Sequence, residues 1–349
     1  MIKNSMLVLN KYYYAIVFAV LLFIAVFNGF NNIGLWQDGG WCIYEMFQDG
    51  VSIDYSRMFA HICLHVPAFC LNFLGLNNAE FLKTITVSHG IWFFLLPLIA
   101  LMFSFFILPE DKKNWFVIPL ASYLITMIFS SYFIASEMYV TIGLFWLVLM
   151  IFLFVDFKTI SVATQLILLS ASFILIRSYQ VSAVLSLLLL IAGISNFYVL
   201  KKQITWPKKT VLLVSFAFLA GSVAVSFYYI LNPVDTNVSK VLDNLKVVSS
   251  KHFIYYFLAA FTASIVNYKN KYLKIAVVLI LTAVSYKFML NNFEILKNAH
   301  DLRHLAVIFA IFFSIILIVI RYFGKNINFN LWKAVCVVLL CLHLLNSIA

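Results

Sequence analysis

Long apolar runs, separated by short polar segments, recur along the whole chain. Each run is roughly the 17 to 25 residues that an α-helix needs to cross a bilayer, apart from a short one with polar edges at 252–267. A segment inside a bilayer must satisfy its own backbone hydrogen bonds, so each run predicts a helix. The chain is therefore expected to be an all-α polytopic membrane protein with about eleven transmembrane helices. The runs cover residues 12–30, 89–109, 115–134, 139–155, 159–176, 180–200, 210–231, 252–267, 273–290, 304–320 and 332–347.

Basic residues between the runs predict the orientation. Lys and Arg concentrate in cytoplasmic loops, and placing the N-terminus inside and the C-terminus outside puts fifteen of the 24 basic residues on the cytoplasmic side. Ten of the 13 acidic residues then fall outside. The fifteen are Lys3, Lys11, Lys112, Lys113, Lys158, Lys201, Lys202, Lys208, Lys209, Lys269, Lys271, Lys274, Arg321, Lys325 and Lys333.

The first outside loop, residues 31–88, is much longer than the others. Its segments WCIYEMFQDG and RMFAHICLHVPAFCLNFLGL mix aromatic, aliphatic and polar residues and are too short in apolar length to cross a membrane. This pattern favours short helices lying in the membrane interface. No repeat or soluble segment interrupts the chain, so residues 1–349 are expected to form a single integral membrane domain.

Composition restricts the classes of function. With 64% apolar residues, 11% charged residues and a mean hydropathy of +1.01, the chain is unlike a water-soluble protein. The net charge of +11 is spread over short loops, so orientation in a membrane explains it better than nucleic acid does. A Gly-rich phosphate loop, GxSxG, HExxH and CxxC are all missing, so soluble nucleotide chemistry is unsupported. The five cysteines show no metal-ligand spacing and are interpreted as buried free thiols, with a disulfide in the first loop as the alternative.

An acid, Asp38, follows the first apolar run in the segment GLWQDGGWCIYEMFQDG, residues 34–50. It can cap a helix beginning near Trp41, because Asp accepts hydrogen bonds from the free amides at a helix start. At the outer interface it can instead serve as a general base or cation ligand for a lipid-borne substrate, which Gly39 and Gly40 would allow to approach the backbone. Both interpretations remain open.

Two more outside turns carry candidate residues. Glu137 stands between two apolar runs with almost no loop, where an acid is costly unless it faces a cavity or a partner. A solvated charge at a helix end is the alternative. In the next outside turn, Arg177 and Tyr179 suit a phosphate, or Arg177 suits Glu137 as a partner. The alternative for this turn is interfacial anchoring.

The remaining candidates lie in or next to the last and the first of the outside loops. Residues 298–306, NAHDLRHLA, place His300, Arg303 and His304 at the start of the tenth run. A guanidinium binds phosphate oxygens in a bidentate manner, so Arg303 with a neighbouring His can hold a lipid phosphate, and a charged helix cap is the alternative. Arg57 and His61, four residues apart in the first loop, are expected on one helical face.

This layout resembles the GT-C superfamily of membrane glycosyltransferases, which take sugars from polyprenyl-phosphate carriers. The likeness rests on many spans, a long first outside loop, Asp38 in WQDGGW, Glu137 in ASEMY and Arg303 in HDLRH. It departs from the family at Glu137, which is followed by Met138 and Tyr139, so no DxD or ExD pair stands there. The metal ligands are therefore unknown, with a divalent cation as the possible cofactor.

The resemblance implies transfer of a sugar from a polyprenyl-phosphate donor to an acceptor hydroxyl at the outer face of the cytoplasmic membrane. Asp38 and Glu137 would be catalytic, and Asp38 would deprotonate the hydroxyl. Arg57, Arg177, Tyr179, His300, Arg303 and His304 would bind the substrate. Trp36, Trp41 and Tyr44 would stack on sugar rings, or else form an interfacial belt. The alternatives are a transporter or flippase for a lipid-linked sugar and a noncatalytic envelope-assembly subunit.

Overall fold

The fold was analysed in a computed structural model, which describes residues 2–31, 58–74, 79–127, 137–178, 182–200, 203–232, 271–291, 299–323 and 327–348. Every regular element in these ranges is helical, which confirms an all-α fold for the described part of the chain. The long helices are α1 (Ile2–Phe30), α5 (Ala79–Ile107), α8 (Glu137–Phe154), α10 (Ser182–Leu200), α11 (Trp206–Leu231), α14 (Lys271–Asn291), α15 (Ala299–Phe323) and α16 (Phe329–Ile348). The shorter ones are α3 (Met58–Leu64), α4 (Val66–Phe73), η3 (Glu110–Phe116), α6 (Val117–Ser122), η4 (Tyr123–Met127), α9 (Val162–Ile174) and η5 (Leu175–Arg177).

Four helices within the described residues are long and apolar enough to cross a membrane, and five shorter apolar helices accompany them. A membrane protein is therefore supported, whereas the number of eleven spans stays a prediction. The expected span at 252–267 lies outside the described residues. The four long segments are Tyr12–Phe30, Lys83–Ile107, Ser182–Val199 and Trp206–Leu231.

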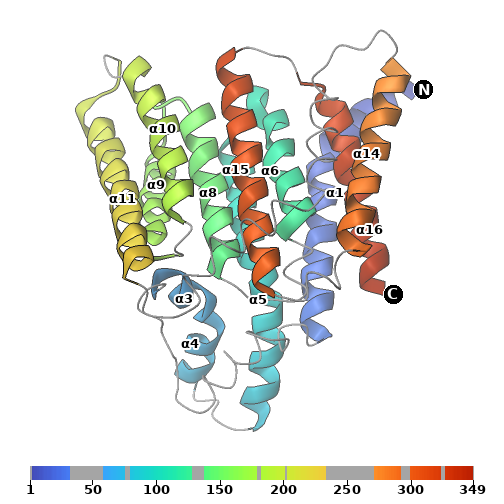
Figure 1. Ribbon diagram of the computed structural model, residues 1–349, viewed down its shortest axis with the longest axis horizontal. Helices are drawn as coiled ribbons and strands as arrows, with labels where there is room; N and C mark the ends of the chain where they lie inside the picture. Colours follow the sequence, from blue (N-terminus) through green and yellow to red (C-terminus); the bar gives the residue numbers. More distant parts are fainter. Residues whose placement is uncertain are drawn as a thin grey trace.

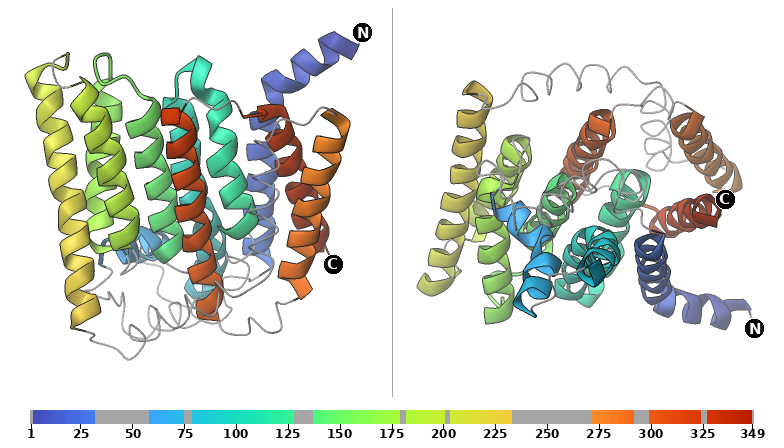
Figure 2. Two further views of the ribbon diagram at one scale, coloured as in Figure 1. Left: turned by 45° about the horizontal axis from the view of Figure 1, so that its top comes forward. Right: turned by 90° about the horizontal axis from the view of Figure 1, so that it is seen from below.

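The helices stand side by side in a bundle, with α11 at one edge and α14 and α16 at the other (Figures 1 and 2). The short helices α3 and α4 lie at one end, called here the α3–α4 end, where α8 and α15 begin and η5 stops (Figure 1). At the opposite end, called the lysine end, α5, α8 and α15 stop and η3 follows. From the bounds of η3, α8, α11, α15 and α16, this end carries Lys112, Lys113, Lys158, Lys208, Lys209, Arg321 and Lys333.

Helix α8 forms the centre of the bundle and contacts α5, α9, α10 and α15. Its side chains from Met138 to Phe154 are almost all buried, because α8 is apolar on every face. A Cβ added at Gly143 would lie 3.0 Å from Pro97 Cα on α5. The missing side chain thus lets α5 and α8 approach closely, as small residues do between membrane helices.

The outer helices have the opposite pattern. Phe23 on α1, Ile191 on α10 and Phe227 on α11 are exposed, and large apolar surfaces of this kind imply contact with lipid. Four serine hydroxyls that α10 and α11 bury contact one another. Hydroxyl contacts of 2.9–3.2 Å connect Ser182, Ser186, Ser222 and Ser226.

Two expected boundaries differ from the structure. Helix α5 begins at Ala79, ten residues before the expected span at 89, because the helix continues beyond its most apolar part. The expected span at 115–134 is not uniform: 3₁₀, α and π geometry follow one another from Glu110 to Met127, and residues 128–134 lie outside the description. Pro119 sits in the first turn of α6, where its missing N–H breaks no helical bond.

The expected first loop contains two short helices in its described part, α3 and α4, of seven and eight residues. Their placement in a membrane interface stays a prediction. The four described cysteines are free thiols, as expected, but the expectation that they are buried is correct only for Cys336: Cys63 is half-buried, and Cys70 and Cys341 are exposed. Cys42 lies outside the described residues.

Candidate functional site

The candidate residues fall into three groups. Asp38, Arg57 and Tyr179 lie outside the described residues, as do the aromatic residues Trp36, Trp41 and Tyr44. For Glu137, His300, Arg303 and His304 the structure describes the helix but not the side chain. Arg177 is described in full, at the last position of η5.

The helices that carry these residues share the α3–α4 end. Glu137 is the first residue of α8, and Arg303 lies in the second turn of α15, which packs against α8. Arg177 stands at the same end, because η5 contacts both α3 and α8 (Figure 1). The ring of Phe59 on α3 packs against Phe173 on α9, 4.6 Å between centroids, and fixes α3 beside η5. The fold thus gathers segments separated by more than 100 residues.

The depth of Glu137 follows from the helix register. Leu64, Phe93 and Val140 form a small buried cluster between α3, α5 and α8. Helices α5 and α8 both run from the α3–α4 end toward the lysine end (Figure 1). His89 is one turn before Phe93, and Glu137 is three residues before Val140, so the two positions lie at a similar depth on neighbouring helices.

Two imidazoles are buried at this end, one at the junction of α3 and α4 and the other on α5. His65 is 3% exposed and His89 is fully buried. Their ring centroids are 5.8 Å apart, and His61 extends the row at 5.4 Å from His65. His61 was a candidate from the sequence, whereas His65 and His89 were not. The spacing of four residues in HICLH and the interruption of an apolar run by His89 are the signals that would have pointed to them.

His89 is an unusual buried group. Neither of its ring nitrogens has a hydrogen-bond partner within the described residues. A buried polar group without a partner costs about 1–3 kcal/mol, so its presence calls for an explanation such as a role in binding or catalysis. Trp92 Nε1 donates to the backbone oxygen of Cys63 at 2.8 Å and holds α5 against α3 just above this residue.

Arg177 brings a positive charge to this end. Its side chain is half-buried, and a guanidinium can bind a phosphate through its paired N–H donors. Cys63 is a poor nucleophile, because burial raises the pKa of its thiol. The described residues contain no group of three side chains able to hold a metal ion.

No family model, curated protein or solved structure matches this chain. The interpretation of the α3–α4 end therefore rests on its own residues.

Proposed function

We propose that the chain is a membrane glycosyltransferase that moves a sugar from a polyprenyl-phosphate carrier to an acceptor hydroxyl. The observation that carries the proposal is the gathering, at the α3–α4 end, of an acid at the start of α8, the guanidinium of Arg177 and the buried pair His65 and His89. An acid that can act as general base and a cation that can stabilise the departing phosphate are the groups that transfer from a phosphate ester requires.

The proposed reaction is a single displacement at the anomeric carbon. A carboxylate, Asp38 with Glu137 as the second acid, removes the proton of the acceptor hydroxyl while its oxygen forms the new glycosidic bond. The bond from the anomeric carbon to the carrier phosphate breaks, and the phosphate oxygen keeps the electron pair. Arg177 and Arg303 stabilise the charge that gathers on that phosphate.

The surroundings suit a lipid-borne donor. Phe73 and Leu74, at the end of α4, are exposed apolar residues at the same end of the bundle, and a polyprenyl chain needs such an apolar approach. The Lys-rich opposite end favours a cytoplasmic location for that end by the positive-inside rule. The reaction would then take place at the outer face of the cytoplasmic membrane.

The test compares two arginines at opposite ends. Arg177→Lys keeps the charge but loses the bidentate fork. The donor concentration needed for half-maximal transfer is expected to rise about tenfold, because one charge-assisted hydrogen bond is lost. Arg321→Lys is the matched control, because Arg321 stacks 5.9 Å from the Phe154 ring at the lysine end. The glycan modification of cells in which each variant replaces the wild type is measured at limiting donor supply, with membrane levels checked.

A weaker modification with Arg177→Lys alone supports the proposal. Equal modification with both variants contradicts the role of Arg177. If Arg177→Lys lowers the modification but removal of either acid does not, the protein is better explained as a transporter of a lipid-linked sugar than as an enzyme.

A further inference from the structure

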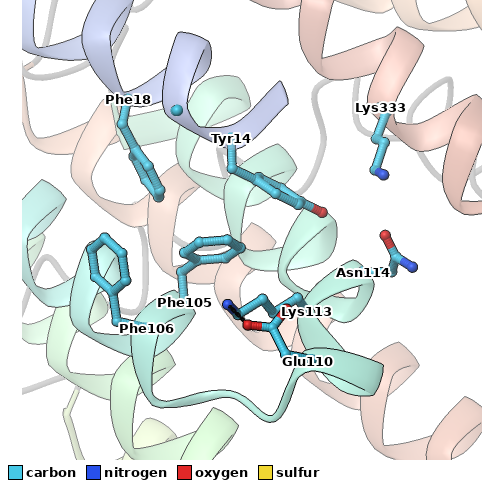
Figure 3. A pocket seen from close by; sticks show the side chains of 9 residues that line it. Tyr14, Phe18, Phe105, Phe106, Glu110, Lys113, Asn114 and Lys333 are labelled. Atoms are coloured by element: carbon cyan, nitrogen blue, oxygen red, sulfur yellow. Dashed lines mark hydrogen bonds and ion pairs between the residues drawn. The ribbon is translucent and has the colours of Figure 1, made fainter. Parts of the chain in front are cut away.

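A pocket of about 390 Å³ opens at the lysine end, opposite to the proposed catalytic end. Its volume lies at the lower end of the range for small-molecule sites. Four elements build it: α1 supplies Tyr14 and Phe18, α5 supplies Phe105 and Phe106, η3 supplies Glu110, Lys113 and Asn114, and α16 supplies Lys333 (Figure 3). Nothing in the proposed transfer reaction uses this pocket.

The polar side of the pocket holds an unsatisfied donor. Tyr14 is 8% exposed, and its hydroxyl has no hydrogen-bond partner within the described residues. Figure 3 shows this hydroxyl pointing to the side on which the Asn114 amide and the Lys333 ammonium lie. A buried hydroxyl is rarely left unpaired in a folded protein, so this geometry indicates a ligand with an acceptor oxygen.

The charges around the pocket favour an anion. Lys333 Nζ lies 5.5 Å from the ring centroids of Tyr13 and Tyr14, and Lys113 lies 5.2 Å from that of Phe105. Glu110 pairs with Lys113, but this carboxylate is largely exposed, and exposed ion pairs are weak enough to exchange partners. The neighbouring carboxylate of Asp111 is neutralised by Lys112 at 2.7 Å and is not a lining residue.

The other side of the pocket is apolar and open. Phe106 is 64% exposed, and Ile16 and Phe103 continue the exposed apolar surface along α1 and α5. In a bundle that crosses a membrane these side chains face acyl chains. A ligand with a phosphate at one end and hydrocarbon at the other fits both sides of the pocket, and basic pockets between membrane helices are suited to anionic headgroups.

We propose that this pocket binds the phosphate of an anionic phospholipid from the leaflet at the lysine end. The Tyr14 hydroxyl and the Asn114 amide donate to the phosphate oxygens, Lys113 and Lys333 balance the charge, and an acyl chain lies along Phe106 and Ile16. The lipid would join α1, η3 and α16, which are far apart in the sequence. The proposal is independent of the reaction at the other end.

The test uses the purified full-length protein in a neutral, phosphate-free detergent. Thermal-shift titrations with phosphatidylglycerol, phosphatidylcholine and inorganic phosphate give apparent affinities. Each lysine near an anionic headgroup is worth about fivefold, so the double variant Lys113→Gln/Lys333→Gln is expected to bind phosphatidylglycerol roughly 30-fold more weakly. Lys158→Gln is the matched control, since Lys158 is exposed at the same end but does not line the pocket.

Tyr14→Phe provides a second variant that removes only the hydroxyl. It is expected to bind phosphatidylglycerol about fivefold more weakly through one lost hydrogen bond, while its stability without lipid is unchanged or higher. This opposite response separates a ligand-binding hydroxyl from a merely structural one. A Tyr14→Phe protein that binds the lipid as tightly as the wild type contradicts the proposal.

The three ligands identify the source of the phosphate. Tight, lysine-dependent binding of phosphatidylglycerol that millimolar phosphate does not displace assigns the pocket to a lipid. Displacement by phosphate, with the same dependence on Lys113 and Lys333, assigns it to free phosphate and supports only the anion site. Equal binding of phosphatidylcholine, or an equal loss in Lys158→Gln, overturns the proposal.

Discussion

Replacing His89 by Phe is expected to stabilise the protein, whereas the same replacement at His343 should destabilise it. Both imidazoles are fully buried, but their hydrogen bonding differs. The nitrogens of His89 have no partner within the described residues, while His343 Nε2 donates to the backbone oxygen of Leu124 at 2.6 Å. The pair therefore compares an unsatisfied and a satisfied histidine in one bundle.

The magnitudes follow from these contacts. Removing the unsatisfied groups of His89 recovers about 1–3 kcal/mol, and fitting the larger ring costs up to about 1.5 kcal/mol, so the net change runs from about −0.5 to about 3 kcal/mol in favour of the folded state. At His343 the replacement removes the hydrogen bond that the buried Leu124 carbonyl accepts, which costs about 0.5–1.5 kcal/mol in addition to the fit. With a similar cost of fit at both sites, the two variants should thus differ by at least about 1.5 kcal/mol.

Thermal unfolding in detergent measures the difference, which should appear as several degrees between the two midpoints. We also expect His89→Phe to lower glycan modification despite its stability, because the imidazole is at a similar depth to Glu137. Equal destabilisation by the two replacements would show that His89 is hydrogen-bonded in the native protein. Its burial would then need no functional explanation.

Two further predictions concern packing and orientation. Gly29→Ala should destabilise the contact of α1 with α5 by about 1–3 kcal/mol, because the new Cβ would lie 2.8 Å from the Ile91 amide nitrogen, and thermal unfolding measures this. Gly221→Ala, with nothing within 4 Å, is the control and should be neutral or stabilising by up to about 1 kcal/mol. A single cysteine replacing Phe73, which is 91% exposed, should react with an impermeant reagent outside intact cells, whereas one replacing Lys158 should not. The reverse labelling would invert the proposed orientation.

The helices were largely predictable because their signals are local. Ser161, which precedes an apolar run, marks the start of α9. Its hydroxyl accepts a hydrogen bond from the Thr164 amide at 3.1 Å and so caps the helix. Pro207 in the first turn likewise marks the start of α11. These features need only neighbouring residues, so the sequence suffices for them.

The candidate site was predictable only in part. Charge and position identified Glu137 and Arg177, but their common end of the bundle depends on how α8 packs against η5 and α3. His65 and His89 come from different helices, and the missing partners of His89 are a property of the packed core. The same holds for the pocket at the lysine end, whose four elements are separated by up to about 300 residues of chain. Pairings of this kind have no local pattern.

The most direct test of the proposed reaction is the conservative replacement of its acids. Asp38→Asn and Glu137→Gln are each introduced into cells that lack the wild-type gene, and the glycan modification lost on deletion is measured beside the membrane level of each variant. Asn and Gln keep size and hydrogen-bonding capacity but cannot take up the proton, so loss of a general base should lower transfer by about 10²- to 10⁴-fold. The account predicts that Asp38→Asn abolishes the modification at normal membrane levels. Normal modification with both variants would contradict it and make the acids structural.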